Sequence, residues 1–180
     1  MMKVAMTIAM ALLALAPAAD LELGKPVGDV ALGKDSLAAL TKEGKVVAVY
    51  FWSSDCPYGP PNFENIKKVD AAFADNAKVK VVIVSSFGEP ELKANAWAKD
   101  AGIKSTFLYD SDKHLAKHFN PRKVNATFVI DAKGNLFYRG GISVNEYKEN
   151  LLLEAIKAAL DGKAAPASDQ KFEGCGIRAS

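Results

Sequence analysis

Two short runs of apolar residues limit what this chain can fold into. Residues 45–52, KVVAVYFW, and residues 79–87, VKVVIVSSF, are nearly continuous in apolar side chains and rich in β-branched and aromatic ones. Each run is too short for a helix with its own caps, and the first is bounded by Gly44 and by two serines. Runs of this kind are typical of strands buried on both faces, which need a covering layer on each side of the sheet. We therefore expect two buried strands, with residues 105–110 as a shorter third.

Three longer segments between and after these runs carry helical patterns. Apolar side chains recur every three or four positions in residues 61–75, and residues 90–102 open on proline and close on glycine, as an amphipathic helix does. Residues 145–160 carry a similar stripe that ends before Gly162. We expect a helix in each segment. In the last one, the buried side chains are expected to be Tyr147, Leu151, Leu152, Ile156 and Leu160.

The remaining patterns complete the expected sheet. Residues 111–119 predict a helix capped by Ser111 or Asp112, and residues 126–131 and 136–141 predict an antiparallel hairpin around a glycine-containing turn. Alternating strands and helices favour a layered α/β fold. The sequence thus predicts a central mixed β-sheet flanked by helices on both faces.

Length and charge restrict the number of domains and the kinds of partner. With 180 residues, of which 49% are apolar, the chain has room for one well-buried core. Its 23 basic and 21 acidic residues give a formal net charge of +2. This charge is too small to provide the field that nucleic acid or an anionic membrane surface attracts, so we expect neither as a partner.

The first residues predict export. Residues 1–19 contain Lys3, an apolar run and the small-residue pattern APA at positions 16–18, which together are typical of a secretory signal peptide. The apolar run is shorter than the ~20 residues that span a bilayer, so an uncleaved anchor is the weaker interpretation. We expect a secreted or periplasmic protein with no membrane span in its mature form. Residues 20–162 are then the folded domain, and residues 163–180 a flexible tail.

Export also bears on the two cysteines of the chain, Cys56 and Cys175, because disulfides persist outside the cytosol. The two are paired, separately reactive or inert, and their positions leave these alternatives open. The 13 residues from Gly162 to Cys175 reach about 43 Å when fully extended, against a radius of gyration of roughly 15 Å for the domain. The tail is therefore long enough for pairing, and such a bond is either a structural staple or the oxidised state of a catalytic pair.

Four short motifs give the chain a family resemblance. They are SSDCP at residues 53–57, FVID at 128–131, YRG at 138–140 and GCGIR at 174–178. With them, about residues 25–160 resemble the thioredoxin-like superfamily, and within it the exported redoxins related to the alkyl hydroperoxide reductase and thiol-specific antioxidant group. The resemblance implies a thioredoxin-like three-layer fold and a thiol oxidoreductase or peroxiredoxin-like antioxidant. Its substrates are expected to be protein thiols and disulfides or peroxide, with a redox partner protein and without a cofactor.

The resemblance implies that Cys56 is the attacking thiol. A strand end beside a helix N-terminus offers free N–H groups and a partial positive charge, which stabilise the thiolate. We therefore expect an accessible sulfur at the sheet edge. Gly59 departs from the family pattern, because it replaces the second cysteine of a C-x-x-C pair, and Asp55 adds a like charge. Pro60 and Pro61 delay the helix, whose start we expect at Pro61, so that the cysteine precedes it by a turn.

The implied substrate site also departs from the family, at Asn125. Thioredoxins have a cis-proline at this point, and peroxiredoxins have an arginine nearby. Ser53 matches the hydroxyl residue of the peroxiredoxin motif P-x-x-x-[ST]-x-x-C, while Val49 replaces its proline. The resemblance then implies that Pro57 and Tyr58 shape a pocket beside the cysteine, and that Asn125 hydrogen-bonds a substrate backbone.

These observations leave two hypotheses from different classes. In the leading one, the protein is an exported thiol-dependent oxidoreductase in which Cys56 forms a mixed disulfide or a sulfenic acid and Cys175 resolves it. In the alternative, a non-catalytic binding or structural protein keeps the fold and uses a disulfide only as a clamp. We expect no metal site, because His114 and His118 lie four apart without a cysteine or carboxylate to complete a shell, and we interpret both as facing solvent.

Overall fold

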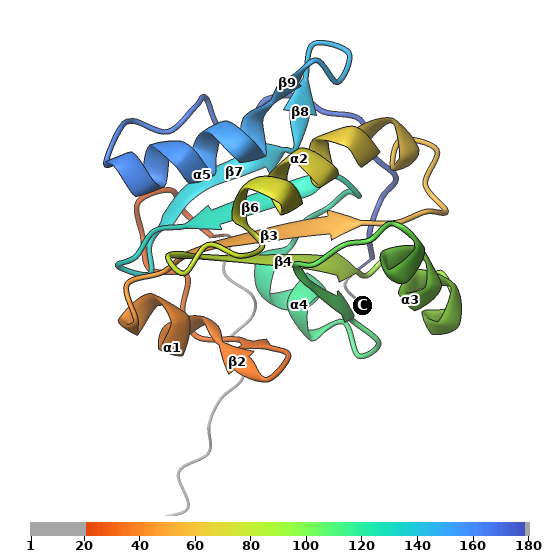
Figure 1. Cartoon of the computed structure of the whole chain (residues 1–180), viewed down its shortest axis with the longest axis horizontal. Helices are drawn as coiled ribbons and strands as arrows, with labels where there is room; N and C mark the ends of the chain where they lie inside the picture. The colour runs from red at the N-terminus through yellow and green to blue at the C-terminus, as the bar shows by residue number, and fades with distance from the viewer. Residues whose placement is uncertain (1–20, 179–180) are drawn as a thin grey trace, which may run out of the picture.

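A five-stranded mixed sheet forms the centre of the computed structural model, which describes residues 21–178 (Figure 1). The predicted signal peptide, residues 1–19, lies outside the described residues. In spatial order the strands are β5 (Thr106–Tyr109), β4 (Val79–Ser85), β3 (Val46–Trp52), β6 (Ala126–Ile130) and β7 (Leu136–Gly141). Neighbouring strands are parallel from β5 to β3 and antiparallel from β3 to β7, so the predicted mixed sheet and its hairpin are confirmed.

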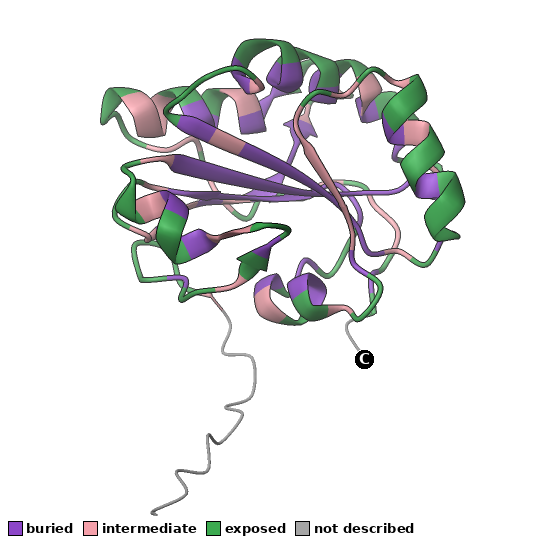
Figure 2. Ribbon diagram, turned by 60° about the horizontal axis from the view of Figure 1, so that its bottom comes forward, coloured by how far each residue is buried: buried purple, intermediate pink, exposed green. Residues whose placement is uncertain are grey.

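The two apolar runs form the middle of this sheet, as the sequence predicts. Every residue of β3 is buried, and β4 is buried except at Lys80, which is partly exposed. Because successive side chains of a strand point to opposite faces, Phe51 enters the core on one face and Trp52 the core on the other. Figure 2 shows the strands as a buried layer between helices whose outer surfaces are exposed.

Helices cover both faces of the sheet, which confirms the predicted layered α/β architecture. α2 (Phe63–Phe73) and α5 (Leu151–Asp161) lie over one face, and α1 (Leu37–Lys42) and α4 (His114–Phe119) lie over the other (Figure 1). α3 (Glu91–Asp100) packs beside the edge strand β5. Each of these helices buries apolar side chains toward the sheet and exposes polar ones to solvent.

The last helix, α5, begins at Leu151 and not at residue 145, where the apolar stripe predicts it. Three consecutive residues before it, Asn145–Tyr147, have φ angles of 51°, 55° and 68°, in a left-handed region that no right-handed helix includes. The helix starts at its cap: the side-chain oxygen of Asn150 accepts a hydrogen bond from the Leu153 N–H at 3.0 Å. Local turn geometry therefore moves the start of the predicted helix by six residues.

Short elements complete the fold. The stretch before β3 carries no pattern that predicts an element, yet it contains two short strands and α1. The short elements are β1 (Ala31–Leu32), β2 (Asp35–Ser36), β8 (Ser143–Val144), β9 (Glu149–Asn150) and a 3-10 helix over Pro60–Asn62. Between residues 21 and 178, no helix has both the length and the apolar composition that crossing a bilayer requires.

The face covered by α1 and α4 also receives the C-terminal tail, residues 163–178. The tail contains no helix or strand apart from one isolated bridge residue. Its side chains nevertheless join the core on this face: Ile177 is buried in it, and Phe172 and Cys175 pack against it. Cys56 belongs to the same cluster. The fold therefore brings the end of the chain to the carboxyl end of β3.

Candidate redox site

Cys56 lies in an irregular loop directly after β3. The loop is closed by a turn in which the Gly59 N–H donates to the Cys56 carbonyl at 2.8 Å. Cys56 is 0% exposed, so the expectation of an accessible sulfur at the sheet edge is wrong. The physical reason is the tail, which covers the loop and which the local sequence around the cysteine does not reveal.

The two cysteines form a disulfide within the chain. Cys56 and Cys175 are 119 residues apart in sequence, and their Cα atoms are 5.8 Å apart. The Cys175 N–H also lies 3.1 Å from the Cys56 sulfur. Cys175 is partly exposed, whereas Cys56 is not. Of the alternatives that the sequence leaves open, pairing with each other is therefore the one found.

The tail docks beside the disulfide by backbone pairing. The Val124 N–H donates to the Cys175 carbonyl at 2.8 Å, and the Ile177 N–H donates to the Arg122 carbonyl at 2.8 Å. Between these bonds, Lys123 forms an antiparallel bridge with the tail. Ile177 is only 9% exposed and anchors the end of the segment in the core. The tail thus binds residues 122–124 as a short added strand would.

Gly174 allows this close approach. A Cβ atom at this position would lie 1.9 Å from the Val124 carbonyl oxygen, a distance that no side chain can occupy. The residue before the tail cysteine therefore has to be glycine if the backbone is to pair as it does. The GCGIR motif thereby gains a steric explanation for its first residue.

Asn125 joins the cysteine loop to the tail. Its side-chain oxygen accepts a hydrogen bond from the Tyr50 hydroxyl at 2.8 Å, and its side-chain nitrogen donates to the carbonyls of Tyr58 at 2.7 Å and Glu173 at 3.1 Å. Burial raises the pKa of Tyr50 well above its ordinary value, so this hydroxyl stays protonated and donates. Asn125 is 1% exposed, and its φ of 74° is one that asparagine tolerates better than most residues. The amide predicted to bind a substrate backbone is bound here to the chain's own tail.

The other predicted pocket residues, Pro57 and Tyr58, are exposed beside the buried cysteine, with Tyr58 39% exposed. The Asp55 carboxylate forms an ion pair with Lys93 on α3, and the Asp55 N–H donates to the Ser53 hydroxyl oxygen at 3.0 Å. The lysine offsets the like charge that Asp55 would otherwise bring to a thiolate. The exposed side of the loop therefore consists of Pro57, Tyr58 and the ion-paired carboxylate of Asp55.

The helix after the loop starts late, as its prolines predict, but at Phe63 and not at the expected Pro61. The 3-10 turn covers Pro60–Asn62, and regular α-helix begins at Phe63. Cys56 thus precedes the helix by more than one turn. Because the field of a helix dipole fades within the first turn, it contributes little to the thiolate at this distance.

Gly59 stands where a C-x-x-C pair has its second cysteine, and the backbone around it leaves no room for a side chain. Its φ of −69° is ordinary, but a Cβ here would lie 2.2 Å from the Ser53 carbonyl oxygen. We expect Gly59→Ala to lower the free energy of unfolding by about 1–3 kcal/mol, the usual range for overpacking. Chemical denaturation measures this change. Gly176→Ala is the matched control, since the nearest atom to its Cβ would be 3.9 Å away. Equal stability of the two variants would contradict the contact.

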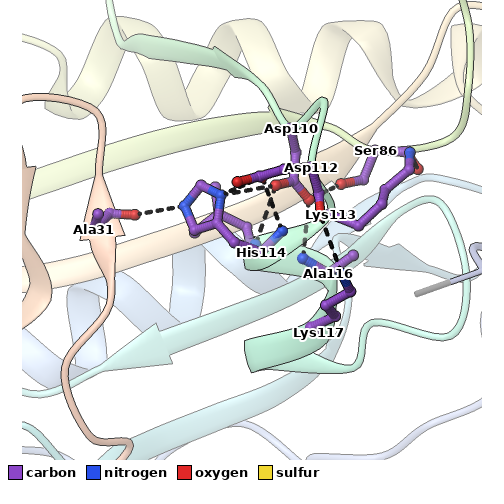
Figure 3. Close-up of polar contacts among 9 residues, drawn as sticks. Ala31, Ser86, Asp110, Asp112, Lys113, His114, Ala116 and Lys117 are labelled. Atoms are coloured by element: carbon purple, nitrogen blue, oxygen red, sulfur yellow. Dashed lines mark hydrogen bonds and ion pairs between the residues drawn. The ribbon is translucent and has the colours of Figure 1, made fainter. Parts of the chain in front are cut away.

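A second polar cluster surrounds the start of α4 (Figure 3). Ligand atoms of Asp110, Asp112 and His114 lie within 4.8 Å of one another, an arrangement that can hold a cation. Asp110, however, is 2% exposed, and its carboxylate accepts hydrogen bonds from the backbone N–H groups of Leu115 at 3.1 Å and Ala116 at 2.9 Å. The Asp112 carboxylate accepts from the His114 N–H at 3.1 Å, so Asp110 shares the capping that the sequence assigns to Ser111 or Asp112.

His114 completes this cluster. Its ring nitrogens lie 2.7 Å from the Asp112 carboxylate and 3.1 Å from the Ala31 carbonyl, so both are engaged (Figure 3). His118, which we interpret from sequence as facing solvent, is instead partly buried against Phe119 with a ring distance of 5.0 Å. The cluster is thus explained as the start of a helix tied to β1.

The pKa of His114 predicts a pH-dependent contribution to stability. Partial burial alone would lower this pKa, but hydrogen bonds to Asp112 and to the Ala31 carbonyl and the charges of Asp112 and Asp110 raise it. The folded state therefore binds the proton more tightly, so the contribution is complete below the unfolded pKa of about 6.5 and is lost as pH rises through the raised value. We expect His114→Ala to be less stable than the parent by about 0.2–1 kcal/mol near pH 5, with a smaller difference near pH 8.

Denaturation of both proteins at a series of pH values measures this difference. His118→Ala is the matched control, because burial lowers the pKa of His118 and reverses the sign. In the parent, the charging of His118 is destabilising below the unfolded pKa, so this variant gains relative stability as pH falls. A His114 difference that is the same at all pH values would contradict the assignment.

Comparison with known proteins identifies the family to which the sequence is similar. The sequence matches the AhpC/TSA family over residues 15–139. The matched range includes Cys56 and Asn125 and ends before the tail, so Cys175 lies outside it. None of the curated proteins matches the chain.

Solved structures share the fold over most of the chain. A hypothetical protein from Sinorhizobium meliloti 1021 is 23% identical with a TM-score of 0.74, and the match covers 88% of this chain and 95% of that one. A thioredoxin-like protein in the oxidized form is 20% identical with a TM-score of 0.61, covering 82% and 96%. The thioredoxin domain of a thiol-disulfide oxidoreductase from Bacteroides vulgatus is 17% identical with a TM-score of 0.54, covering 67% and 89%. These likenesses confirm the thioredoxin-like fold that the sequence predicts.

Proposed function

The chain belongs to the AhpC/TSA family, and from this membership we propose that it is an exported thiol-disulfide oxidoreductase in which Cys56 attacks and Cys175 resolves. The observation that carries the proposal is the disulfide between a cysteine in the loop after β3 and a cysteine on a tail without a helix or strand of its own. Because the tail contributes no strand to the central sheet, this bond can open without breaking the sheet.

The reaction begins from the reduced pair, with the tail released from residues 122–124. The Cys56 thiolate attacks one sulfur of a substrate disulfide, a mixed disulfide forms, and the other substrate sulfur leaves as a thiolate that takes up a proton. The Cys175 thiolate then attacks the Cys56 sulfur, and the second substrate thiol is released. Two electrons pass from the cysteine pair to the substrate, and the tail docks as the internal disulfide closes.

Residues around the loop have assigned roles in this scheme. Pro57 and Tyr58 are exposed beside Cys56, so they are available to contact a substrate. Release of the tail frees the Asn125 amide from the Glu173 carbonyl, and the amide then donates to a substrate backbone carbonyl instead. A redox partner protein restores the reduced pair by attacking Cys175, because this is the partly exposed member of the disulfide.

Family membership supports peroxide reduction as a second candidate activity. In that reaction the Cys56 thiolate attacks a peroxide oxygen, an alcohol or water leaves, and the resulting sulfenic acid condenses with Cys175 to the same disulfide with loss of water. Two features favour thiol-disulfide exchange over it. Asn125 stands near where a peroxiredoxin has its arginine, and Val49 stands where the peroxiredoxin motif has its proline.

A non-catalytic protein with a disulfide clamp remains the alternative class, and the complete burial of Cys56 is the observation that favours it. Reaction with a disulfide separates the two. We expect the protein, reduced and then freed of dithiothreitol, to reduce glutathione disulfide, Cys56→Ser to be inactive, and Cys175→Ser to accumulate a mixed disulfide on Cys56 that mass spectrometry detects. Hydrogen peroxide in place of glutathione disulfide tests the second candidate. Equal rates for the parent and Cys56→Ser with both substrates would favour the non-catalytic protein in which the disulfide is only a structural clamp.

Export is the second part of the proposal, and it rests on the pattern of residues 1–19. A disulfide of this kind persists in an oxidising compartment. We expect the protein recovered from a periplasmic or culture-medium fraction to begin near residue 20, as the mass of its N-terminal peptide will show. An intact N-terminus in the cytosolic fraction alone would contradict export.

A further inference from the structure

A cavity on the tail side of the molecule has no role in the chemistry above. It measures about 500 Å³ and lies between the first described residues, the loop after α4, strands β6 and β7, and tail residues 169–172. Cavities that bind small molecules are typically about 300–1,000 Å³. The site is therefore large enough for a ligand with a body of roughly a dozen carbon atoms.

Apolar side chains line much of this cavity. Phe119 and Phe128 come from the core of the α1–α4 face, Phe172 comes from the tail, and Leu21 and Leu23 come from the first described residues. Leu23 is 44% exposed and thus unusually open for a leucine beside a core. Leu21, Leu23 and Phe172 keep exposed surface, and this favours a ligand with an apolar body, because binding removes that surface from water.

Arg139 fixes the walls of the cavity. Its Nε and Nη2 donate to the Asp169 carboxylate at 2.8 and 2.9 Å, and its Nη1 donates to the Leu21 carbonyl at 2.7 Å. The same guanidinium therefore ties strand β7 both to the first described residues and to the tail. It also lowers the pKa of Asp169, chiefly through these hydrogen bonds, so the pair stays charged. The bidentate pairing of Arg139 with Asp169 holds this side of the cavity in a defined geometry.

The charges on the lining favour an anion. Four cationic residues and two carboxylates line the cavity, and Arg139 already occupies one of those carboxylates. Lys123 and Lys171 form no ion pair with any residue between 21 and 178. Both are exposed and line the cavity near Phe172: Lys171 precedes it in sequence, and Lys123 Nζ lies 5.9 Å from its ring centre. A negative head group would find two exposed lysines beside an apolar lining.

The tail wall couples this cavity to the disulfide. Phe172 is three residues from Cys175, and the tail is held in place by the bond to Cys56 and by the backbone pairing beside it. We infer that the cavity binds an amphipathic anion, and that it does so in the disulfide form, where the tail completes it. By reciprocity, a ligand that needs the docked tail protects the disulfide from reduction.

Calorimetric titration of the oxidised protein with dodecanoate below its micelle concentration tests the inference. We expect saturable binding of one molecule, no binding of dodecyltrimethylammonium, and affinity about tenfold weaker after reduction with dithiothreitol. Lys123→Glu with Lys171→Glu is expected to weaken binding severalfold. Lys99→Glu, an exposed lysine on α3, is the matched control and should bind as the parent does.

Dodecanoate is also expected to slow the reduction of the disulfide by dithiothreitol. None of these measurements requires turnover, so they stand or fall apart from the proposed oxidoreductase activity. Absence of dodecanoate binding, or equal binding of the cationic analogue, would overturn the site. Equal affinity in the oxidised and reduced forms would overturn the coupling, and binding to phosphatidylglycerol vesicles without binding to free dodecanoate would assign the surface to a membrane instead.

Discussion

Replacing Cys175 with alanine is expected to lower the free energy of unfolding by about 4–5 kcal/mol. The bond joins positions 119 residues apart, so it removes a large amount of conformational freedom from the unfolded chain on the loop-closure view. The stability of a domain of this size is typically about 5–15 kcal/mol, so the loss is a large part of the total, and we expect the variant to be folded without denaturant but to have a much lower midpoint. Guanidinium denaturation of both proteins without reductant measures the change.

The Cys56→Ala variant and the double variant complete the experiment. If the bond is the common element, the double variant loses little more than either single one, because both singles already remove it. The parent in dithiothreitol should approach the Cys175→Ala midpoint. A midpoint that responds neither to the substitution nor to the reductant would show that the tail and its disulfide contribute nothing to the fold.

Replacing Asn125 with alanine is expected to have the next largest effect, a loss of about 3 kcal/mol or more. The substitution leaves the buried Tyr50 hydroxyl and the carbonyls of Tyr58 and Glu173 without their partner. An unsatisfied buried polar group typically costs about 1–3 kcal/mol. Alanine also tolerates the φ of 74° less well than asparagine does. Denaturation measures the total.

Two further variants at this position separate the causes. Asn125→Gly relieves the backbone and removes the hydrogen bonds, and Asn125→Asp keeps an acceptor for Tyr50 but loses both donations. Under limited proteolysis we expect the aspartate variant to be cleaved faster than the parent within residues 163–178, because the Glu173 carbonyl no longer accepts a hydrogen bond from residue 125. Unchanged stability and unchanged tail cleavage in all three variants would mean that Asn125 does not hold the tail.

Much of the architecture follows from local patterns in the sequence. The runs that become β3 and β4 have no alternative to burial on both faces, and the hairpin of β6 and β7 has a clear turn between its strands. The start of α5 does not follow, because nothing in the apolar stripe signals the left-handed backbone at Asn145–Tyr147. Periodicity reports which face of an element is buried, while its ends depend on single dihedral angles.

The candidate site was predictable in its residues and not in its arrangement. Motif resemblance singled out Cys56, Cys175 and Asn125, and the length of the tail allowed the two cysteines to meet. The burial of Cys56 and the contact between Gly174 and the Val124 carbonyl depend on how two distant segments pack. Such contacts are set by tertiary structure. The residues around Gly174 therefore do not show that its backbone packs against Val124.

The wide spacing of the two cysteines has a consequence for biosynthesis. Cys175 follows Cys56 by 119 residues, so strands β4 to β7 are all synthesised before the partner of Cys56 emerges. Over that interval Cys56 is an unpaired thiol, which can form mixed disulfides with other thiols. The native bond therefore closes late, and the rate of its closure sets how long the new protein depends on a disulfide isomerase.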